Sequence, residues 1–387
     1  MSMNQQSKHL VFCDQYGSVG GGQTVLLSAV KIAAKYFEKI TVVIPRSGSL
    51  WRLFEEGIGD SVTLVETDEI PLNNVNKTLV DYIRMIFATL KFSIKHRRLI
   101  RGASLVYANG PRQFPAILFL SLWTKTPAIY HVHLIHGRVE RELIAIVARS
   151  NRTKMVVANS GTTARRLKAA LFFSKEISNR RLKIIENGLS QEFTRLSYQD
   201  KFHKNPKSIH IAVIGTIRPE KRQEIVVAAA RNFPDIVFHI VGKVDADSRA
   251  YFERLRGVAG DNVSFHSECS NIAGFLGSDE IKICIVPSRF ESFGLVAIEA
   301  MACSCITLVS NCEALKDIAT KTGAIVFGRE PKELIEVLDK ILRTRAEGLQ
   351  VIARRQFDRT MMIYGSDNFE RQFSRTIIDA VESVPET

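Results

Sequence analysis

Arg289-Phe-Glu-Ser-Phe-Gly-Leu-Val-Ala-Ile-Glu-Ala-Met301 is the stretch of this 387-residue sequence that decides the fold. It follows an apolar, strand-like run, residues 281–286, which Pro287-Ser288 closes. Its own apolar residues recur at helical spacing, at Leu295, Ile298 and Met301. A strand, a turn and a helix in this order indicate one unit of an α/β protein with a parallel sheet.

The stretch carries two acids, Glu291 and Glu299, with seven residues between them. A helix that begins near Phe293-Gly294 directs its free N–H groups toward a bound anion, and Gly294 lets a diphosphate approach the main chain. Glu291 can then accept hydrogen bonds from sugar hydroxyls, and Glu299 can accept both hydroxyls of a ribose. Glutamates at this spacing are also common on solvated helix faces. Phe-Gly after the first and Ala-Met-Ala after the second favour a binding site.

This stretch resembles the Glu-x7-Glu signature of the retaining GT-B-fold glycosyltransferases of family 4, also called glycosyl transferases group 1. The resemblance extends over almost the whole chain. It implies an α/β GT-B fold, in which two doubly wound Rossmann-like domains face each other across a cleft. It further implies that a hexose-type sugar moves from a nucleoside-diphosphate sugar to a glycan or lipid-linked acceptor, as in bacterial surface polysaccharide or lipopolysaccharide synthesis. Neither a metal nor a cofactor is expected.

A second motif, Gly215-Thr-Ile-Arg-Pro-Glu-Lys221, follows the first strand of the expected second domain. Members of the family usually carry Gly-Arg-x-x-x-x-Lys here, and the Arg and Lys neutralise the departing diphosphate. This chain keeps Lys221 but has Thr216 in place of the arginine. Arg218 is either a substitute that reaches in from the same loop or an ordinary surface charge.

Two features of the first half complete the candidate site. Gly20-Gly21-Gly22 lies between the first strand and its helix, where it is either a flexible turn or a contact for a phosphate or sugar. His131, His133 and His136 cluster after a strand, but a zinc site needs more ligands than this acid-free region supplies. The resemblance implies that His133 lies near the transferred sugar, and His131 is expected to point the opposite way or to pack in the core.

The resulting candidates fall into two groups. The candidate catalytic residues are Glu291, Lys221, Arg218 and His133. The candidate substrate-binding residues are Gly21, Gly22, Gly215, Thr216, Phe293, Gly294, Leu295 and Glu299. The spacing leaves open whether Glu313 or Asp317 is a further acid that faces the donor.

Composition and patterning predict two domains. The chain is 45% hydrophobic and long enough for two cores, and no apolar run reaches the ~18 residues of a transmembrane helix. Its polar start shows no secretory signal, so we expect a cytoplasmic protein, peripheral on the inner face of the membrane if it binds lipid. The six cysteines lack metal or disulfide spacing and are expected to be free thiols. Alternating strand-like and helical runs place the first domain at residues 1–197, the second at 198–365, and a final helix, 366–387, that returns to the first.

The net charge of +13 lies entirely in the first half of the sequence. Residues 1–200 contain 28 Lys and Arg against 15 Asp and Glu, whereas residues 201–387 contain 25 of each. No acid occurs from Tyr82 to Val139, and the helix-like region 77–101 interleaves bases with apolar residues. This region is either a solvated basic face or a surface that docks on anionic lipid.

Three other functions could share these features. A sugar-nucleotide epimerase of the same fold would bind the donor but need no acceptor. A nucleic-acid-binding protein would explain the basic half, but the sequence shows no helix-turn-helix pattern or stacking platform. A dinucleotide-dependent dehydrogenase would carry Gly-x-Gly-x-x-Gly, which is missing.

Overall fold

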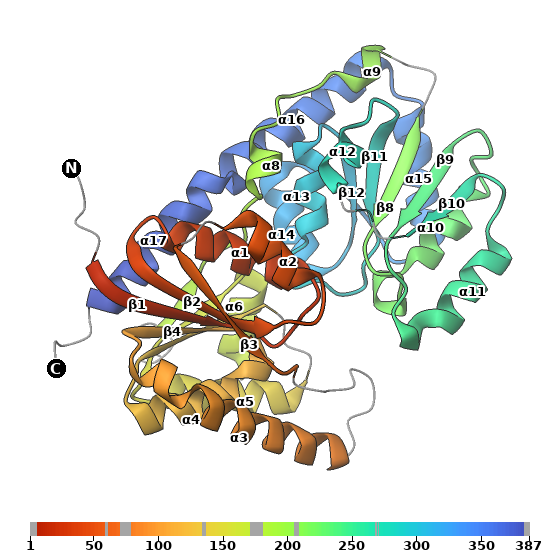
Figure 1. The fold of residues 1–387 in the computed structure, drawn as a ribbon. Coiled ribbons are helices and arrows are strands. Elements are labelled where there is room, and N and C mark those ends of the chain that lie inside the picture. Colours follow the sequence, from red (N-terminus) through yellow and green to blue (C-terminus); the bar gives the residue numbers. More distant parts are fainter. Residues whose placement is uncertain are drawn as a thin grey trace. The chain divides into compact units, whose positions relative to one another are not determined.

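The protein divides into two compact units, seen in a computed structural model that describes residues 6–58, 61–69, 79–133, 137–170, 181–204, 209–267, 269 and 271–382 (Figure 1). The first unit comprises Met1–Asn187 and Phe369–Thr387, and the second Gly188–Asn368. The first boundary thus precedes the expected residue 198, because Leu189 and Phe193 join the core of the second unit. The C-terminal segment returns to the first unit at Phe369, close to the expected residue 366.

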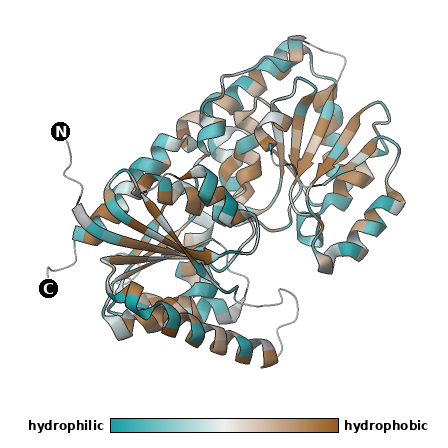
Figure 2. Cartoon of the chain, in the orientation of Figure 1, coloured by the Kyte–Doolittle hydropathy of each residue, from teal (hydrophilic) through white to brown (hydrophobic). Residues whose placement is uncertain are grey.

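The first unit is built on a seven-stranded sheet in which all neighbouring strands are parallel. Its strand order is β3-β2-β1-β4-β5-β6-β7. Most strands are continuous apolar runs because both faces of a parallel sheet are covered by helices. Figure 2 shows this hydrophobic colour along the strands of both units. The strands are β1 Gln6–Cys13, β2 Phe37–Pro45, β3 Val62–Thr67, β4 Leu105–Asn109, β5 Ala128–Val132, β6 Thr153–Ala158 and β7 Leu182–Ile184.

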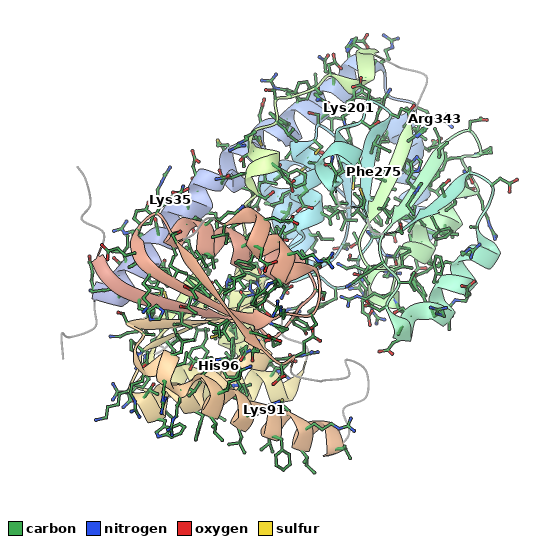
Figure 3. The ribbon with its side chains drawn as sticks, in the orientation of Figure 1. Lys35, Lys91, His96, Lys201, Phe275 and Arg343 are labelled. Atoms are coloured by element: carbon green, nitrogen blue, oxygen red, sulfur yellow. The ribbon has the colours of Figure 1, made fainter. Side chains whose placement is uncertain are left out.

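Helices connect these strands, and the C-terminal helix α17 packs in the same unit. Phe373 of α17 packs its ring edge-on against Tyr107 of β4, with centroids 5.8 Å apart. Glu370, on the same helix, forms an ion pair of 2.7 Å with Lys35, which Figure 3 labels. The helices are α1 Gly21–Ala33, α2 Ser49–Gly57, α3 Leu79–Arg101, η1 Pro111–Gln113, α4 Phe114–Thr124, α5 Arg138–Arg149, α6 Gly161–Ala170 and α17 Ser366–Glu382.

The second unit repeats the architecture on a six-stranded parallel sheet of order β10-β9-β8-β11-β12-β13. Its strands are β8 His210–Ile214, β9 Val237–Val241, β10 Val263–His266, β11 Ile281–Val286, β12 Ile306–Ser310 and β13 Ile325–Phe327. Its helices are α8 Gln191–Thr194, α9 Lys201–Lys204, η2 Pro219–Lys221, α10 Gln223–Ala230, η3 Ala246–Ser248, α11 Arg249–Val258, α12 Ile272–Gly277, α13 Leu295–Ala302, α14 Glu313–Thr322, α15 Pro331–Leu342 and α16 Ala346–Tyr364.

Lys201 connects α9, near the start of the second unit, to the sheet of that unit through hydrogen bonds. The side chain, labelled in Figure 3, is fully buried. Its ammonium group donates hydrogen bonds to the carbonyls of Leu276 and Ile281. A buried charge is tolerated only when its donors are satisfied in this way. Lys201 is therefore a structural residue that ties α9 to the beginning of β11.

Each sheet reverses its strand order once. In the first unit the reversal lies between β1 and β4, and in the second between β8 and β11. In open α/β sheets, ligands bind outside the carboxyl ends of the strands at such a switch point. A ligand site is therefore expected at the carboxyl ends of these strands.

Candidate functional site

Lys221 and Glu291 are joined at the switch point of the second unit. Lys221 ends η2, which follows β8, and Glu291 lies in the turn after β11. The Lys221 ammonium group donates a hydrogen bond to Glu291 Oε1, and the side chains are 23% and 15% exposed. Ser288 Oγ donates a second hydrogen bond of 2.8 Å to the same carboxylate oxygen. The fold thus brings together one acid and one base that sequence reasoning selected separately.

Backbone hydrogen bonds hold the two loops that carry this pair. The Arg289 N–H donates to the Glu220 carbonyl at 2.9 Å, which connects the β11 turn to η2. Ser310 Oγ, at the end of β12, donates to the Ser288 carbonyl. The positions of both charged groups are therefore fixed by the ends of three neighbouring strands, which favours a preorganised site.

Gly215, Thr216 and Arg218 lie in the loop that follows β8. Gly215 has a φ of 143°, and the Gly215 carbonyl lies so close to Gly242 that a Cβ on Gly242 would come within 2.0 Å of its oxygen. The Thr216 carbonyl accepts a hydrogen bond of 3.1 Å from the Gln223 side chain. The Arg218 Nε lies 3.8 Å from the Glu220 carboxylate and has no hydrogen-bond partner among the described residues. Arg218 thus pairs with Glu220 in the same loop.

Phe293, Gly294 and Leu295 form the start of α13. The helix begins at Leu295, and Gly294 precedes it with a φ of 115°. A Cβ on Gly294 would lie 2.6 Å from Leu315 Cδ2, so glycine is required by packing as well as by the backbone. The Phe293 ring is buried and packs edge-on against Tyr364, with centroids 5.6 Å apart. Only the backbone of Phe293 is left to contact a ligand.

Glu299 lies in α13, half-buried, and is electrostatically coupled to a second acid. Burial raises the pKa of Glu299 to about 7, and the carboxylate of Glu192 in α8 contributes to the same shift. A carboxyl group in this state changes charge near neutral pH. Ionised Glu299 can accept hydrogen bonds from hydroxyl groups.

The remaining acids of the expected donor side lie on α14. Glu313 is the exposed first residue of this helix, and Asp317 lies one turn further on and is half-buried. Cys312 precedes the helix, and burial raises the pKa of its thiol, with a smaller contribution from the Glu291 carboxylate. The start of α14 therefore lies close to Glu291.

A hydrogen-bonded network that sequence reasoning missed lies at the switch point of the first unit. His133 Nε2 donates to Asn109 Oδ1 at 2.6 Å, and Asn109 Nδ2 donates to Asp14 Oδ2 at 2.5 Å. Gln23 Nε2 donates to the same oxygen at 3.0 Å. Asp14, Asn109 and His133 each follow or end a central strand, β1, β4 and β5. Polar residues at the carboxyl ends of adjacent apolar strands were the available signal.

The charges of this network are set by burial. Burial raises the pKa of Asp14 to about 6, although its hydrogen bonds act in the opposite direction. Burial lowers the pKa of His133 to about 4, which keeps the imidazole neutral at pH 7. Because Nε2 donates to Asn109, Nδ1 carries no proton, and it has no partner among the described residues. His133 can therefore accept a hydrogen bond from a bound hydroxyl.

His131 packs in the core, which was one of the two orientations expected for it. His131 is buried and shares a hydrogen bond of 2.5 Å with the Tyr107 hydroxyl, as expected for a core residue. It does not point away from His133, because residues two apart on a strand share a face, and the ring centroids are 4.0 Å apart. His136 lies outside the described residues. Within the described part of the chain, no group of three His, Cys, Asp or Glu is placed to hold a metal ion.

Gly21 and Gly22 belong to the first turn of α1, not to the loop that the sequence suggested. Gly20 precedes the helix. A Cβ on Gly22 would lie 3.3 Å from His133 Cδ2, so this glycine lets the imidazole approach the helix closely. The Gly22 carbonyl also accepts a hydrogen bond of 3.3 Å from Asn109. The glycines therefore connect α1 to the network of Asp14, Asn109 and His133.

Solved structures resemble this arrangement over nearly the whole chain. Anabaena HepE in complex with UDP and glucose superimposes with a TM-score of 0.79 and 18% identity, covering 97% of this chain and all of that one. Sucrose-phosphate synthase from Thermosynechococcus elongatus gives a TM-score of 0.75 at 15% identity, with 97% and 100% covered. The chain has the GT-B fold. WaaG, a glycosyltransferase involved in lipopolysaccharide biosynthesis, is a further GT-B neighbour, with a TM-score of 0.66 at 16% identity and 95% and 99% covered.

Sequence comparisons cover part of this GT-B chain. Residues 195–358 match the family model described as glycosyl transferases group 1. D-inositol 3-phosphate glycosyltransferase from Mycobacterium sp. (strain KMS) is 27% identical over 147 residues, which cover 36% of this chain and 33% of the relative. The enzyme of the same name from Mycobacterium leprae (strain TN) is 30% identical over 147 residues, 35% of this chain and 33% of the relative. The alignment thus spans about a third of these relatives.

Proposed function

We propose that this protein is a retaining family 4 glycosyltransferase that moves a hexose-type sugar from a nucleoside-diphosphate sugar to an acceptor hydroxyl. The observation that carries the proposal is the hydrogen-bonded pair of Lys221 and Glu291 at the β8–β11 switch point. The family model that matches residues 195–358, the partial matches to glycosyltransferases, and the UDP and glucose held by HepE support a nucleotide-sugar donor.

The reaction breaks the bond between the anomeric carbon and the diphosphate oxygen, and the diphosphate leaves with the electron pair. The acceptor hydroxyl oxygen forms the new bond to the anomeric carbon, and its proton passes to the departing diphosphate. In this proposal the ammonium group of Lys221 stabilises the charge that develops on the diphosphate, with Arg218 as a second cation. No metal takes part. Removing one preorganised donor of this kind typically lowers turnover by about a hundredfold to a thousandfold.

Further groups in both units orient the donor and the sugar. Glu291 accepts hydrogen bonds from sugar hydroxyls once the ligand displaces its partner Lys221. Glu299 accepts the hydroxyls of the ribose. The backbone N–H groups at the start of α13 and in the loop of Gly215 bind the diphosphate. In the first unit, the unprotonated Nδ1 of His133 accepts a hydrogen bond from a sugar hydroxyl, and the first turn of α1 at Gly21 and Gly22 lies next to it.

We propose that the acceptor is a glycan or a lipid-linked saccharide of a bacterial surface polysaccharide or lipopolysaccharide, and that transfer takes place at the cytoplasmic face of the membrane. The involvement of WaaG in lipopolysaccharide biosynthesis supports this class of acceptor. The basic first half of the chain supports an anionic environment.

A donor panel tests the proposal. The protein is first screened by thermal shift against UDP-, GDP- and ADP-sugars, and the stabilising donor is then incubated with and without saccharide acceptors. A glycosyltransferase releases the nucleoside diphosphate with the acceptor present, and Glu291→Gln abolishes most of this release. Conversion of the donor sugar without an acceptor would identify an epimerase instead. No thermal shift with any donor would contradict the nucleotide-sugar site.

A further inference from the structure

Helix α3 exposes a continuous apolar stripe. Ile83, Phe87, Leu90 and Ile94 recur at spacings of three and four residues, so they lie on one side of the helix. Their exposed fractions are 44%, 66%, 43% and 65%. Ile86, at the edge of this stripe, is 56% exposed. Isolated exposed apolar residues are normal, but a stripe of this length indicates an interaction surface.

The opposite side of α3 faces the core of the first unit and is more polar than the stripe. Phe92, Ser93, His96 and Ile100 are buried there. Ser93 Oγ donates to the Thr89 carbonyl at 2.7 Å, and burial lowers the pKa of His96 to about 4. An ordinary surface helix has its apolar residues against the core and its polar residues in water. Core packing therefore does not explain the exposed stripe of α3.

Helix α4 extends the apolar surface. Phe119, Leu122 and Trp123 are 45%, 53% and 42% exposed, and the rings of Phe119 and Trp123 lie 5.6 Å apart. The guanidinium group of Arg97 on α3 lies over the Trp123 ring at 5.5 Å, which joins the two helices at this surface. We call the exposed residues of both helices the α3–α4 surface; its apolar members are Ile83, Ile86, Phe87, Leu90, Ile94, Phe119, Leu122 and Trp123.

The exposed charged side chains that the structure describes on α3 and α4 are all bases. Exposed bases flank the stripe, and no acid occurs in the sequence between residues 82 and 139. Figure 2 shows teal and brown alternating along α3, and Figure 3 labels Lys91, the base that pairs at 2.9 Å with Asp68 after β3. The exposed bases are Arg84, Lys91, Lys95, Arg97, Arg98, Arg101 and Lys125.

We propose that the α3–α4 surface docks on a bilayer that contains anionic lipid, with α3 lying in the interface. Aliphatic and aromatic residues that enter the acyl boundary, flanked by bases that bind headgroup phosphates, are the pattern of an interfacial helix. A protein partner would need a matching acidic surface, whereas anionic lipid supplies negative charge wherever the bases point. Among the described residues no helix is able to span a bilayer, so the contact proposed is peripheral. This inference deepens the proposed function by placing the enzyme beside a lipid-linked acceptor, but docking itself requires no donor.

Vesicle sedimentation without nucleotide tests the docking. The full chain is mixed with vesicles of phosphatidylcholine alone or with about 30% phosphatidylglycerol as the anionic lipid, at low and at high salt. We expect binding to the anionic vesicles at low salt, at least tenfold weaker binding to neutral vesicles, and weakening by salt. Equal binding to both vesicles, or binding to neither, would overturn the proposal.

Two double variants distinguish binding through the α3–α4 surface from nonspecific binding through any exposed apolar residue. Phe87→Glu with Ile94→Glu should reduce binding to anionic vesicles at least tenfold. Val351→Glu with Met362→Glu, which alters equally exposed residues of α16, should leave it unchanged. Nucleotide-induced thermal stabilisation in both variants confirms that the chain is folded, and it is a separate readout of the proposed donor site. Equal losses in both variants, or a concentration-dependent dimer that only the α3 variant dissociates, would overturn the lipid assignment.

Discussion

The Lys221 ammonium group donates a hydrogen bond to the Glu291 carboxylate, although 70 residues separate them in the sequence. Each of these two half-buried side chains neutralises the charge of the other. A ligand that binds here therefore replaces the hydrogen bond between them with charge-assisted hydrogen bonds of its own. The pair is therefore the point at which the proposed reaction is most sensitive to single substitutions.

Glu291→Gln should lower kcat by about a hundredfold or more, because the sugar loses a charged acceptor. The dissociation constant of the free nucleoside diphosphate should stay within about threefold, since the sugar is absent from that ligand. Steady-state kinetics and calorimetry measure the two quantities. Full activity in this variant would contradict the role of Glu291.

Lys221→Met should lower kcat and also weaken binding of the nucleoside diphosphate. Because Lys221 and Glu291 are in contact, the effects of the two substitutions should not add in the double variant. Arg343→Met is the control: Arg343 forms a comparable ion pair of 2.8 Å with Asp339 on the surface of α15, and its loss should leave kcat unchanged. Additive effects of Lys221→Met and Glu291→Gln would show that the pair does not act as a unit.

Nucleotide affinity should rise with pH through neutrality if Glu299 binds the ribose. Burial raises the pKa of Glu299 to about 7, so the carboxylate that accepts hydroxyl groups is lost as the pH falls below this value. The expected loss is up to about tenfold per pH unit below 7. Glu299→Gln should remove this pH dependence, whereas Glu336→Gln, on the exposed face of α15, should retain it. Calorimetric titrations between pH 6 and pH 8 compare the three proteins.

The free energy of unfolding of the first unit should fall as the pH rises and Asp14 loses its proton. Its pKa is raised by burial to about 6 in the folded state, against 3.8 as its usual value. The folded protein therefore binds this proton more tightly than the unfolded chain, and the extra stability is complete below pH 3.8 and lost above pH 6. The whole difference is about 3 kcal/mol for a shift of this size, and about 2 kcal/mol of it falls between pH 4.5 and pH 7. Denaturant unfolding of wild type and Asp14→Asn at pH 4.5 and 7 measures it; a difference between the two proteins that does not change with pH would contradict this account.

Gly294→Ala should destabilise the second unit by about 2 kcal/mol or more. The residue has a φ of 115°, and its Cβ would lie 2.6 Å from the buried Leu315 side chain. Gly257→Ala, at a position of α11 where a Cβ meets no atom within 4 Å, is the control and should raise the stability by about 0.5 kcal/mol. Thermal unfolding of both variants checks the comparison, and equal melting temperatures would contradict it.

Hydrophobic periodicity predicted most of the fold. Strands β5, β9, β10, β11 and β12 begin and end where their apolar runs do, because a parallel strand is buried on both faces. Strand β7, Leu182–Ile184, was missed because it is three residues long at the sheet edge and carries exposed side chains. Helix α1 was expected to begin after the three glycines but spans Gly21–Ala33, because two of the glycines enter its first turn.

The sequence predicted those site residues that belong to a local motif, but not the contacts between residues that are far apart in the sequence. The Glu-x7-Glu stretch and Lys221 could be selected from local motifs, whereas their contact depends on the parallel pairing of β8 and β11. Asp14 and Asn109 lie 95 residues apart and each is unremarkable in its own segment. Their hydrogen bond follows from the pairing of β1 with β4, which no local pattern encodes.

The return of the chain at Phe369 makes the second unit an insertion within the first. Residues 188–368 are one continuous segment, whereas the first unit consists of two segments that are separate in the sequence. A ribosome that has finished residue 187 has not yet made the helix that contacts Tyr107 through Phe373. The amino-terminal unit therefore cannot complete its packing until the C-terminal helix has been made.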